Sequence, residues 1–328
     1  MFDNYVLKKA PSIMLIFLLF AISFFTFPIY NKGPAVITVP DDISTINGAV
    51  TLVSSGGTVR IKRGTYTESV YINKSITLLG EDNPTIIGPL NVANAQNVSV
   101  KSITFIIDPP GTEPAITVTN TSNMALENLN IKWSGILLTN ASNLHVRSCL
   151  FTENPGPAIS IRGKASKNIT IEWCNFNQIY SALSVRQASQ ITFKFNIVNA
   201  TEAAIKLFSE CRNATIYLNN LLNGLAEDDG LNSKWYNETL KLGNYWGKKD
   251  DEKDANGDGI IDEPKIINGA AHSMDEYPLA KPFQEYLKSQ NQQTGAMAII
   301  IFAIVGVVAA TAATILFYRK RRGKVEQK

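Results

Sequence analysis

The chain has 328 residues, of which 45% are hydrophobic and 18% are charged, and its formal net charge is +3. A chain this apolar and this poor in charge is neither intrinsically disordered nor a coiled coil. Much of the positive charge lies in the last ten residues, so the remainder is near neutral and we expect no nucleic-acid partner.

The first 30 residues have the pattern of an export signal. An uncharged apolar run from Ile13 to Phe27 follows Lys8 and Lys9, as in a secretory signal peptide or a signal anchor. The residues after the run are bulky, so they offer no clear cleavage site. The pattern leaves open whether segment 1–30 is removed or remains as an anchor.

Residues 31–57 are predicted to form an N-terminal cap. Within them, Ile46, Ala49, Val50 and Val53 recur at helical spacing after a Ser/Thr N-cap. This pattern predicts a short amphipathic helix over residues 44–54, which would cover the first coil of the repeats that follow.

Residues 58–224 contain a repeat of short strands. One sequence motif, an Asn or Gln followed by alternating apolar and polar residues, occurs six times. It begins at Asn97, Asn123, Asn143, Asn168, Gln190 and Asn213, so successive motifs are 26, 20, 25, 22 and 23 residues apart. This alternation predicts half-buried strands, whereas a helical repeat needs a period of about 3.6 residues. Strands that recur at this spacing predict a single-stranded, right-handed parallel β-helix, an all-β solenoid.

Equal positions of the repeat should stack about 4.8 Å apart in neighbouring coils. Counted from the opening Asn or Gln, position +3 should point inside, and position +6 changes from apolar residues to cysteines and then to asparagines. The position +3 residues include Leu126, Val146, Ile171 and Phe193, and those at +6 include Cys149, Cys174, Asn196 and Asn219. We expect the stacked asparagines to bond to one another and the cysteines to remain free thiols.

Residues 225–280 are predicted to form a C-terminal cap that contains a calcium-type loop. Oxygen ligands recur at loop positions 1, 3, 5, 7 and 9, with Gly259 at position 6, and the ligands are Asp254, Asn256, Asp258, the Ile260 carbonyl and Asp262. Position 12 is Lys265 instead of Glu, so a further ligand would come from Asp250, Asp251 or Asp275. The pattern predicts a structural calcium ion, and the alternative is an Asp/Gly turn without metal.

The C-terminal residues predict a membrane span. Residues 281–294 are assigned to a linker, residues 295–318 carry no charge, and residues 319–328 form a basic tail. An uncharged run of this length is enough to cross a membrane, and flanking positive residues stay cytoplasmic. We therefore expect terminal transmembrane helices in the cell membrane, an extracellular β-helix and a cytoplasmic tail.

Eight N-x-Ser/Thr sequons agree with an exported domain, and each is a candidate glycosylation site. They are Asn73, Asn97, Asn120, Asn140, Asn168, Asn199, Asn213 and Asn237.

Residues suited to catalysis are few. No Asp occurs between Asp108 and Asp228, and among the central glutamates only Glu127 and Glu172 share a repeat position. Because two coils separate them, these two glutamates should lie about 10 Å apart, slightly farther than the two catalytic carboxyl groups of inverting glycosidases. We therefore assign no catalytic residue.

Two tryptophans fall near predicted coil corners. Trp133 and Trp173 could stack on sugar rings or pack against the bends, and we treat both as candidate carbohydrate-binding residues.

Several segments resemble a known family. The segments 40–46, 56–61, 64–68 and 72–80 resemble the start of pectate-lyase-like right-handed β-helices, most closely the NosD-like carbohydrate-binding and sugar-hydrolase (CASH) group. Residues 243–247, 254–264 and 275–279 resemble the C-terminal cap of archaeal surface members.

The resemblance implies the fold more than an activity, because this fold hosts lyases, hydrolases, esterases and binding proteins. The copper role of NosD-like proteins does not fit two histidines that are 127 residues apart. We predict a membrane-anchored extracellular protein that binds surface polysaccharide or has a structural role without catalysis. The alternative is a polysaccharide lyase or glycoside hydrolase of the same fold. The sequence does not predict the oligomeric state.

Overall fold

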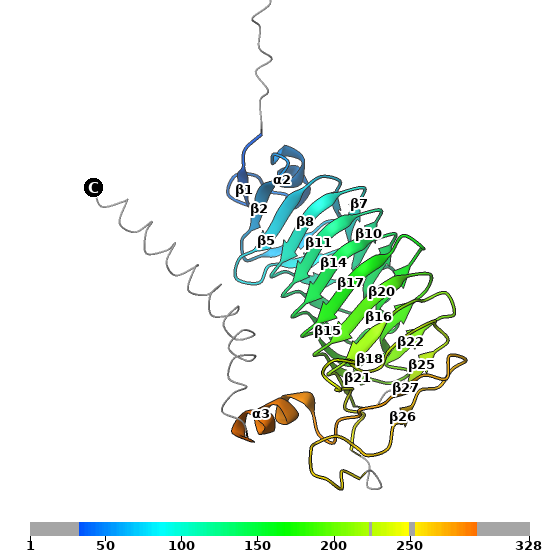
Figure 1. The fold of residues 1–328 in the computed structure, drawn as a ribbon. Helices are drawn as coiled ribbons and strands as arrows, with labels where there is room; N and C mark the ends of the chain where they lie inside the picture. The colour runs from blue at the N-terminus through cyan, green and yellow to red at the C-terminus, as the bar shows by residue number, and fades with distance from the viewer. Residues whose placement is uncertain (1–32, 223–224, 249–252, 294–328) are drawn as a thin grey trace, which may run out of the picture. The chain divides into compact units, whose positions relative to one another are not determined.

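The computed structural model describes residues 33–222, 225–248 and 253–293, which wind through a stack of coils (Figure 1). The strands form three parallel sheets, which we call sheets A, B and C. Sheet A contains β1 (Val36–Val39), β2 (Gly57–Ile61), β5 (Ile76–Gly80), β8 (Gln96–Lys101), β11 (Ser122–Glu127), β14 (Ser142–Arg147), β17 (Lys167–Glu172), β20 (Ser189–Lys194) and β23 (Thr215–Tyr217).

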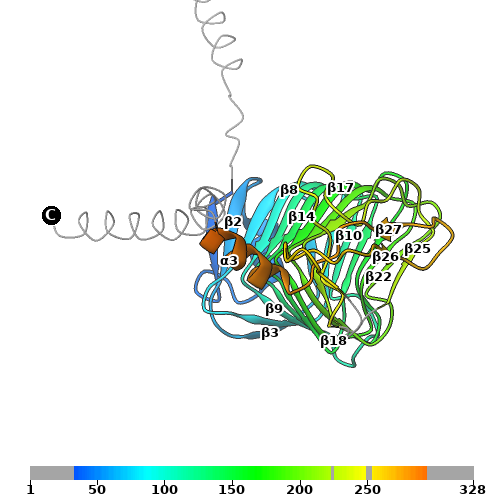
Figure 2. The ribbon, with the colours of Figure 1, turned by 60° about the horizontal axis from the view of Figure 1, so that its bottom comes forward.

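The other two sheets complete each coil. Sheet B contains β3 (Thr65–Thr67), β6 (Thr85–Ile87), β9 (Thr104–Ile106), β12 (Asn130–Lys132), β15 (Leu150–Thr152), β18 (Asn175–Ile179), β21 (Ile197–Ala200) and β24 (Asn220–Leu221). Sheet C contains β4 (Val70–Ile72), β7 (Leu90–Ala93), β10 (Ile116–Thr119), β13 (Ile136–Thr139), β16 (Pro157–Arg162), β19 (Ser181–Val185), β22 (Ile205–Leu207) and β25 (Ala226–Asp228). With the lower end turned forward, Figure 2 shows the sheets on three sides of the stack.

The predicted ladders of apolar residues are confirmed. Leu126, Val146, Ile171 and Phe193 are partners in register on β11, β14, β17 and β20, and each is 0% exposed. Sheet B contributes a second ladder, in which the rings of Phe151 and Phe176 stack 4.7 Å apart. These side chains are held in the interior by burial of apolar surface, which stabilises each coil against its neighbours.

The bend between sheets A and B is made by one residue in the left-handed conformation. Trp173, Phe195 and Leu218 take this position with φ of 58°, 56° and 53°. The next residue then turns inward. In successive coils these inward residues are Cys149, Cys174, Asn196 and Asn219, all of them buried.

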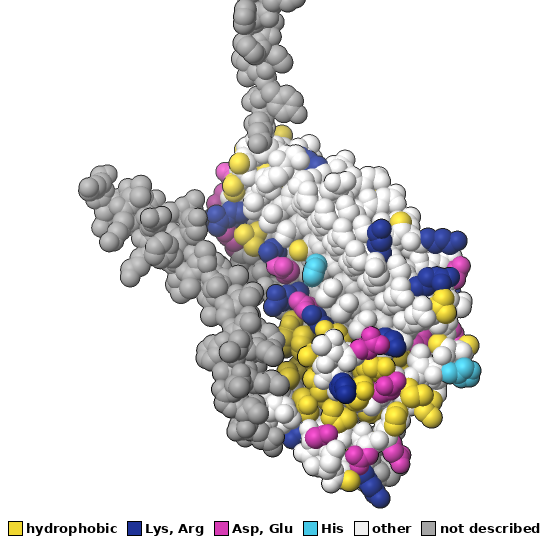
Figure 3. Space-filling view, viewed as in Figure 1, with side chains coloured by type: hydrophobic (Ala, Val, Ile, Leu, Met, Phe, Trp, Pro, Cys, Tyr) yellow, Lys and Arg dark blue, Asp and Glu magenta, His cyan; other side chains and the backbone are white. Residues whose placement is uncertain are grey.

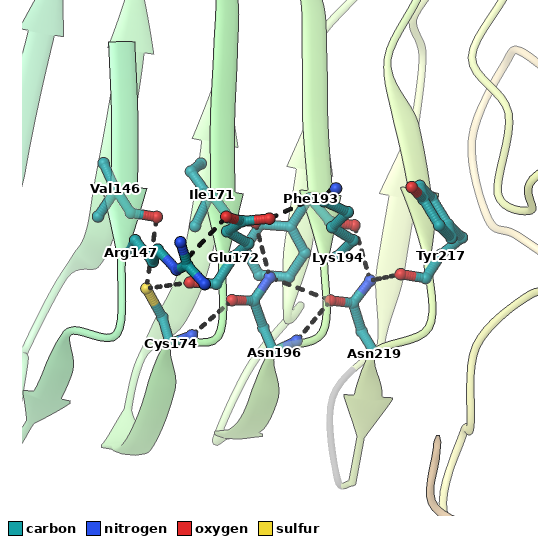
Figure 4. A network of polar contacts seen from close by, with 10 residues as sticks. All are labelled: Val146, Arg147, Ile171, Glu172, Cys174, Phe193, Lys194, Asn196, Tyr217 and Asn219. Atoms are coloured by element: carbon teal, nitrogen blue, oxygen red, sulfur yellow. Dashed lines mark hydrogen bonds and ion pairs between the residues drawn. The ribbon is translucent and has the colours of Figure 1, made fainter. Parts of the chain in front are cut away.

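The asparagines form the predicted ladder (Figure 4). Asn196 Nδ2 donates to Asn219 Oδ1 at 3.0 Å, and Asn219 Nδ2 donates to Asn244 Oδ1 at 2.9 Å. Asn219 Nδ2 also donates to the carbonyl of Phe193 at 2.8 Å. The ladder therefore supplies hydrogen-bond partners to backbone groups near the bend. The cysteines are free thiols, and burial raises the pKa of Cys174 well above its ordinary value.

The N-terminal cap agrees with its prediction. Helix α2 (Ile46–Leu52) begins after Thr45, whose hydroxyl accepts a bond from Gly48 N at 3.2 Å. Ile46, Ala49 and Val50 are buried against the first coil. The first strand of the stack is β1, so pairing in sheet A begins before residue 58, the predicted start of the coils.

The C-terminal cap follows β25 and contains the antiparallel pair β26 (Lys265–Ile266) and β27 (Met274–Asp275) and the helix α3 (Phe283–Gln293). Helix α3 occupies the segment that the sequence assigned to a linker. Its Phe283 is buried and lies against the rings of Trp173 and Phe195, with centroids 6.1 Å and 5.8 Å away. The helix therefore covers the aromatic bend between sheets A and B.

No helix within residues 33–222, 225–248 and 253–293 is long and apolar enough to span a membrane. The predicted export segment 1–30, the span 295–318 and the tail 319–328 lie outside the described residues.

Candidate functional site

The predicted calcium loop folds back on itself in the C-terminal cap. Four of its backbone amides donate to its own side chains: Gly259 to Asp254 at 2.9 Å, Ile260 to Asp258 at 2.8 Å, Asp258 to Asn256 at 2.9 Å and Ala255 to Asp262 at 3.0 Å. Gly259 has a φ of 88° and lies against the Tyr286 ring, so a side chain at this turn would clash with α3.

The loop offers part of a cation site. Asp254 Oδ1 is shielded from solvent and accepts no hydrogen bond from the described chain, so it is an oxygen that a cation could satisfy. However, the described residues contain no group of three or more His, Cys, Asp or Glu side chains arranged to hold a metal. Asp250 and Asp251, two of the candidates for the missing ligand, lie outside the described residues.

Asp275, the third candidate, lies at the end of the asparagine ladder. Its carboxylate is 0% exposed and accepts bonds from Asn244 N at 2.7 Å, Trp246 Nε1 at 2.9 Å and Tyr277 N at 3.1 Å. Burial raises the pKa of Asp275 to about 6, although these hydrogen bonds oppose the rise. Asp275 therefore closes the ladder in the cap, a role that the sequence did not predict.

A second buried carboxylate joins the last coil to the cap. Asp228 is 0% exposed and accepts bonds from Trp235 Nε1 at 2.9 Å and Ser273 Oγ at 2.7 Å. Burial, and then the charge of Asp228, raise the pKa of the Cys211 thiol to about 12. Cys211 is therefore a poor nucleophile, because the thiolate is the reactive form.

The two candidate tryptophans lie at coil corners, as predicted, and both make contacts within the chain. Trp133 Nε1 donates to Glu153 at 2.8 Å, and this bond, followed by the charge of Lys132, lowers the pKa of Glu153. Lys132 Nζ lies 4.7 Å from the centre of the Trp133 ring. Trp173 stacks on Phe195 at 4.5 Å under helix α3. Both indoles thus have roles in holding the coils together.

Several sequon asparagines bond through the nitrogen that a glycan would modify. Asn120 Nδ2 donates to Asn94 at 3.3 Å, Asn140 Nδ2 donates to Asn120 at 3.3 Å, and Asn168 Nδ2 donates to Asn143 at 3.0 Å. These bonds form two exposed asparagine ladders on the outside of the coils. In the strands that follow an opening Asn, the Ser or Thr of the sequon is the next outward-facing residue, so the repeat itself generates many of the motifs.

The outer surface of sheet A carries a shallow polar trough of about 420 Å³. It runs over β14, β17, β20 and β23 and is lined by two columns: Asn143, Asn168, Gln190 and Asn213, and beside them His145, Thr170, Thr192 and Thr215. The hydroxyls of the three threonines have no hydrogen-bond partner within the described chain. In Figure 3, where sheet A faces the reader, the upper part of this face is mostly white, which marks side chains that are neither apolar nor charged.

A row of alternating charges borders the trough. Its members lie in register on β8, β11, β14, β17 and β20 and are Lys101, Glu127, Arg147, Glu172 and Lys194. Glu172 lies between Arg147 at 3.6 Å and Lys194 at 3.4 Å (Figure 4), and Glu127 pairs with Lys101 at 2.8 Å. The two glutamates that share a repeat position are thus separated by Arg147 and held in ion pairs. Position +4 of the repeat, read in full, shows this alternation, which the glutamates alone do not reveal.

A comparison of the chain with known protein families agrees with the fold of the coils. Residues 90–221 match the family described as "Right handed beta helix region". The middle of the chain is a right-handed parallel β-helix. None of the curated proteins matches the chain.

Seven chains among the solved structures match. One of them is ORF18 of Geobacillus virus E2, which is 15% identical with a TM-score of 0.27, over 62% of this chain and 58% of that chain. At this TM-score the similarity carries no argument about function.

Proposed function

We propose that this protein is a membrane-anchored cell-surface β-helix that binds polysaccharide along the trough on sheet A, without catalysis. The observation that supports this proposal is the pair of polar columns that line the trough. Hydroxyl and amide groups both donate and accept hydrogen bonds, as do the hydroxyls of sugars. Because the columns repeat in each coil, about 4.8 Å apart, they suit a polymer with repeating units better than a compact ligand.

The absence of catalysis is supported by the charged row beside the trough. A glycosidase needs one carboxyl as an acid and another as a base or nucleophile. Glu127 and Glu172 are each bound to basic neighbours, and Arg147 stands between them.

The terminal sequences support the proposed export and anchoring. The uncharged residues 295–318 and the basic tail 319–328 support one span with the β-helix outside the cell. Segment 1–30 supports export, and exposed sequons outside the trough, such as Asn73 and Asn97, are compatible with glycosylation there.

Calcium is proposed as a structural ion of the cap. Asp254, Asn256, Asp258 and Asp262, with the carbonyl of Ile260, would hold it, and the shielded Asp254 Oδ1 supports this assignment. The ion would neutralise the carboxylates of a loop that packs directly on α3, where Gly259 meets Tyr286.

The test of the binding proposal uses the full chain in lipid nanodiscs and an array of polysaccharides. The triple variant Thr170→Ala, Thr192→Ala, Thr215→Ala should weaken binding at least about tenfold, because three hydrogen bonds of about 0.5–1.5 kcal/mol each are lost. The matched control changes Thr65, Thr85 and Thr104 to Ala, three threonines in register on sheet B. Equal loss in both variants, or no binding to any polysaccharide, would contradict the proposal. Cleavage of a bound polysaccharide would contradict its non-catalytic part.

A further inference from the structure

Exposed basic residues gather at one corner of the stack, where the chain passes from sheet C to sheet A. They lie in or beside the turns of three successive coils, and we call them the basic corner: Arg162, Lys164, Lys167, Arg186 and Arg212. All five are exposed, and none forms an ion pair within the described chain. Glu210 is the single acidic residue in residues 162–167, 186–188 and 208–214, so these turns have a net charge of 5 − 1 = +4.

The fold itself does not require these charges. The same turn in the three preceding coils is neutral and contains Asn94, Asn120 and Asn140, which form an exposed hydrogen-bonded ladder. By contrast, Arg162 and Arg186 follow directly on Ile161 and Val185, which are partners in register. Like charges on neighbouring strands repel each other and destabilise a sheet. An anion between them would remove this repulsion.

The basic corner adjoins the trough on sheet A. Lys167 precedes Asn168 and Arg212 precedes Asn213, and both asparagines line the trough. Lys167 and Arg212 belong to one column, with Ser189 between them, so they lie two coils or about 10 Å apart. Figure 3 shows dark blue groups along the right side of the neutral face. A ligand that follows the trough would therefore meet cations along one side.

We propose that the basic corner binds the anionic groups of an acidic polysaccharide, whose sugar hydroxyls bind in the adjoining trough. This inference rests on the proposed polysaccharide binding and names the class of ligand. Unpaired lysine and arginine side chains bind carboxylate, sulfate or phosphate groups through charge-assisted hydrogen bonds. The Arg186 guanidinium also makes a cation–π contact with Phe208, because it lies 3.5 Å from the centre of that ring.

The lining of the trough favours a polysaccharide over a nucleic acid. Proteins that bind single strands stack the bases on aromatic side chains. The eight residues that line the trough include no Phe, Tyr or Trp. They offer amide, hydroxyl and imidazole groups, which match the edges of sugars.

The experiment compares three probes on the full chain in nanodiscs of zwitterionic lipid, with a chelator present: alginate, dextran sulfate and neutral dextran. The test variant is Lys167→Gln, Arg186→Gln, Arg212→Gln. The control is Arg63→Gln, Lys241→Gln, Lys253→Gln, which removes the same charge from three exposed basic residues elsewhere. We expect the acidic probes to bind more tightly than dextran. The test variant should lose at least about tenfold in affinity for them, with a weaker dependence on salt, and the control should lose far less.

Several results would overturn the inference. Equal loss in both variants would mean that net charge, and not the corner, determines affinity. Equal binding of dextran would refute the acidic class but leave the proposed function standing, whereas no binding of any polysaccharide would refute both. Tighter binding of a single-stranded DNA competitor than of alginate would assign the corner to nucleic acid.

Discussion

The interior of the stack and the outer surface of sheet A are built from alternate residues of the same strands, yet they follow different rules. Inward positions within the strands of sheet A stay apolar from coil to coil, as Leu126, Val146, Ile171 and Phe193 do. Outward positions vary with the coil: the turn into sheet A is neutral at Asn120 and Asn140 and basic further on. Stacking therefore constrains the inside of every coil, while the outside is free to take on a local function.

A charge placed in the interior should reduce the stability of the fold most. Ile171→Asp places an unpaired charge among the stacked apolar side chains, which costs several kcal/mol, and the variant should not fold. Thr170→Asp, one residue away on the outer surface, should fold with little change. Circular dichroism and yield of the folded chain check both. A cooperative, soluble Ile171→Asp variant would show that this register is not essential.

Removing a rung of the buried asparagine ladder should have the next largest effect. Asn219→Ala removes the side-chain partner of the Phe193 carbonyl, the Tyr217 carbonyl and the backbone amide of Asn196. Each buried unpaired group costs about 1–3 kcal/mol, so the free energy of unfolding should fall by about 4 kcal/mol. Asn213→Ala, on the outer surface, should change it by about 0.5 kcal/mol or less. Urea unfolding measures the difference, and similar losses would contradict the distinction between inside and outside.

The end of that ladder should make the cap sensitive to pH. Asp275 has a pKa of about 6 in the folded chain and about 3.9 when unfolded, so the folded state binds its proton more tightly. Its contribution is complete below about pH 4 and is lost as pH rises through 6, a loss of up to about 3 kcal/mol.

Urea unfolding of the parent chain between pH 4 and 7 should show this loss, and Asp275→Asn should remove it. If both chains have the same pH dependence over this window, Asp275 is not the group responsible.

Calcium should act on the cap and leave sheet A unchanged. If the ion binds only the folded loop, a hundredfold excess over Kd adds about 2.7 kcal/mol of stability, which chelator should reverse. Asp258→Ala should remove most of the response, because Asp258 is one of the proposed ligands. Melting curves with calcium and with chelator test this, and indifference of the parent chain would leave the loop as a turn without metal.

The inside of the stack could be predicted from the sequence, because period-two alternation and equal spacing determine which residues point inward. Ile171 and Asn196 were placed correctly for this reason. The sequence predicts a linker where helix α3 forms, because this segment is mainly polar and only a few of its residues, such as Phe283, are buried. The position of α3 depends on the contact between Phe283 and Trp173, which is distant in the sequence. The residue pattern within the helix cannot predict that contact.

The outer surface was predicted less well. The alternation of residues 143–147 predicts that His145 and Arg147 face outward, as they do, but the trough depends on columns from four strands together. Asp275 was a candidate calcium ligand because it is acidic and near the loop in sequence. Its burial beside Asn244 follows from how the cap folds over the last coil, which residue type and spacing do not specify.

Zero-length cross-linking of bound alginate to the full chain locates the bound polysaccharide on the surface. A carbodiimide joins the carboxylates of the ligand to lysine amines, and mass spectrometry then identifies the lysines. If the polysaccharide follows the trough, coupling is expected at Lys164 and Lys167, at its border, with little at the exposed Lys62 of the N-terminal coils or the exposed Lys248 of the cap. Coupling spread evenly over exposed lysines, or concentrated away from this corner, would contradict the assignment of polysaccharide binding to the outer surface of sheet A.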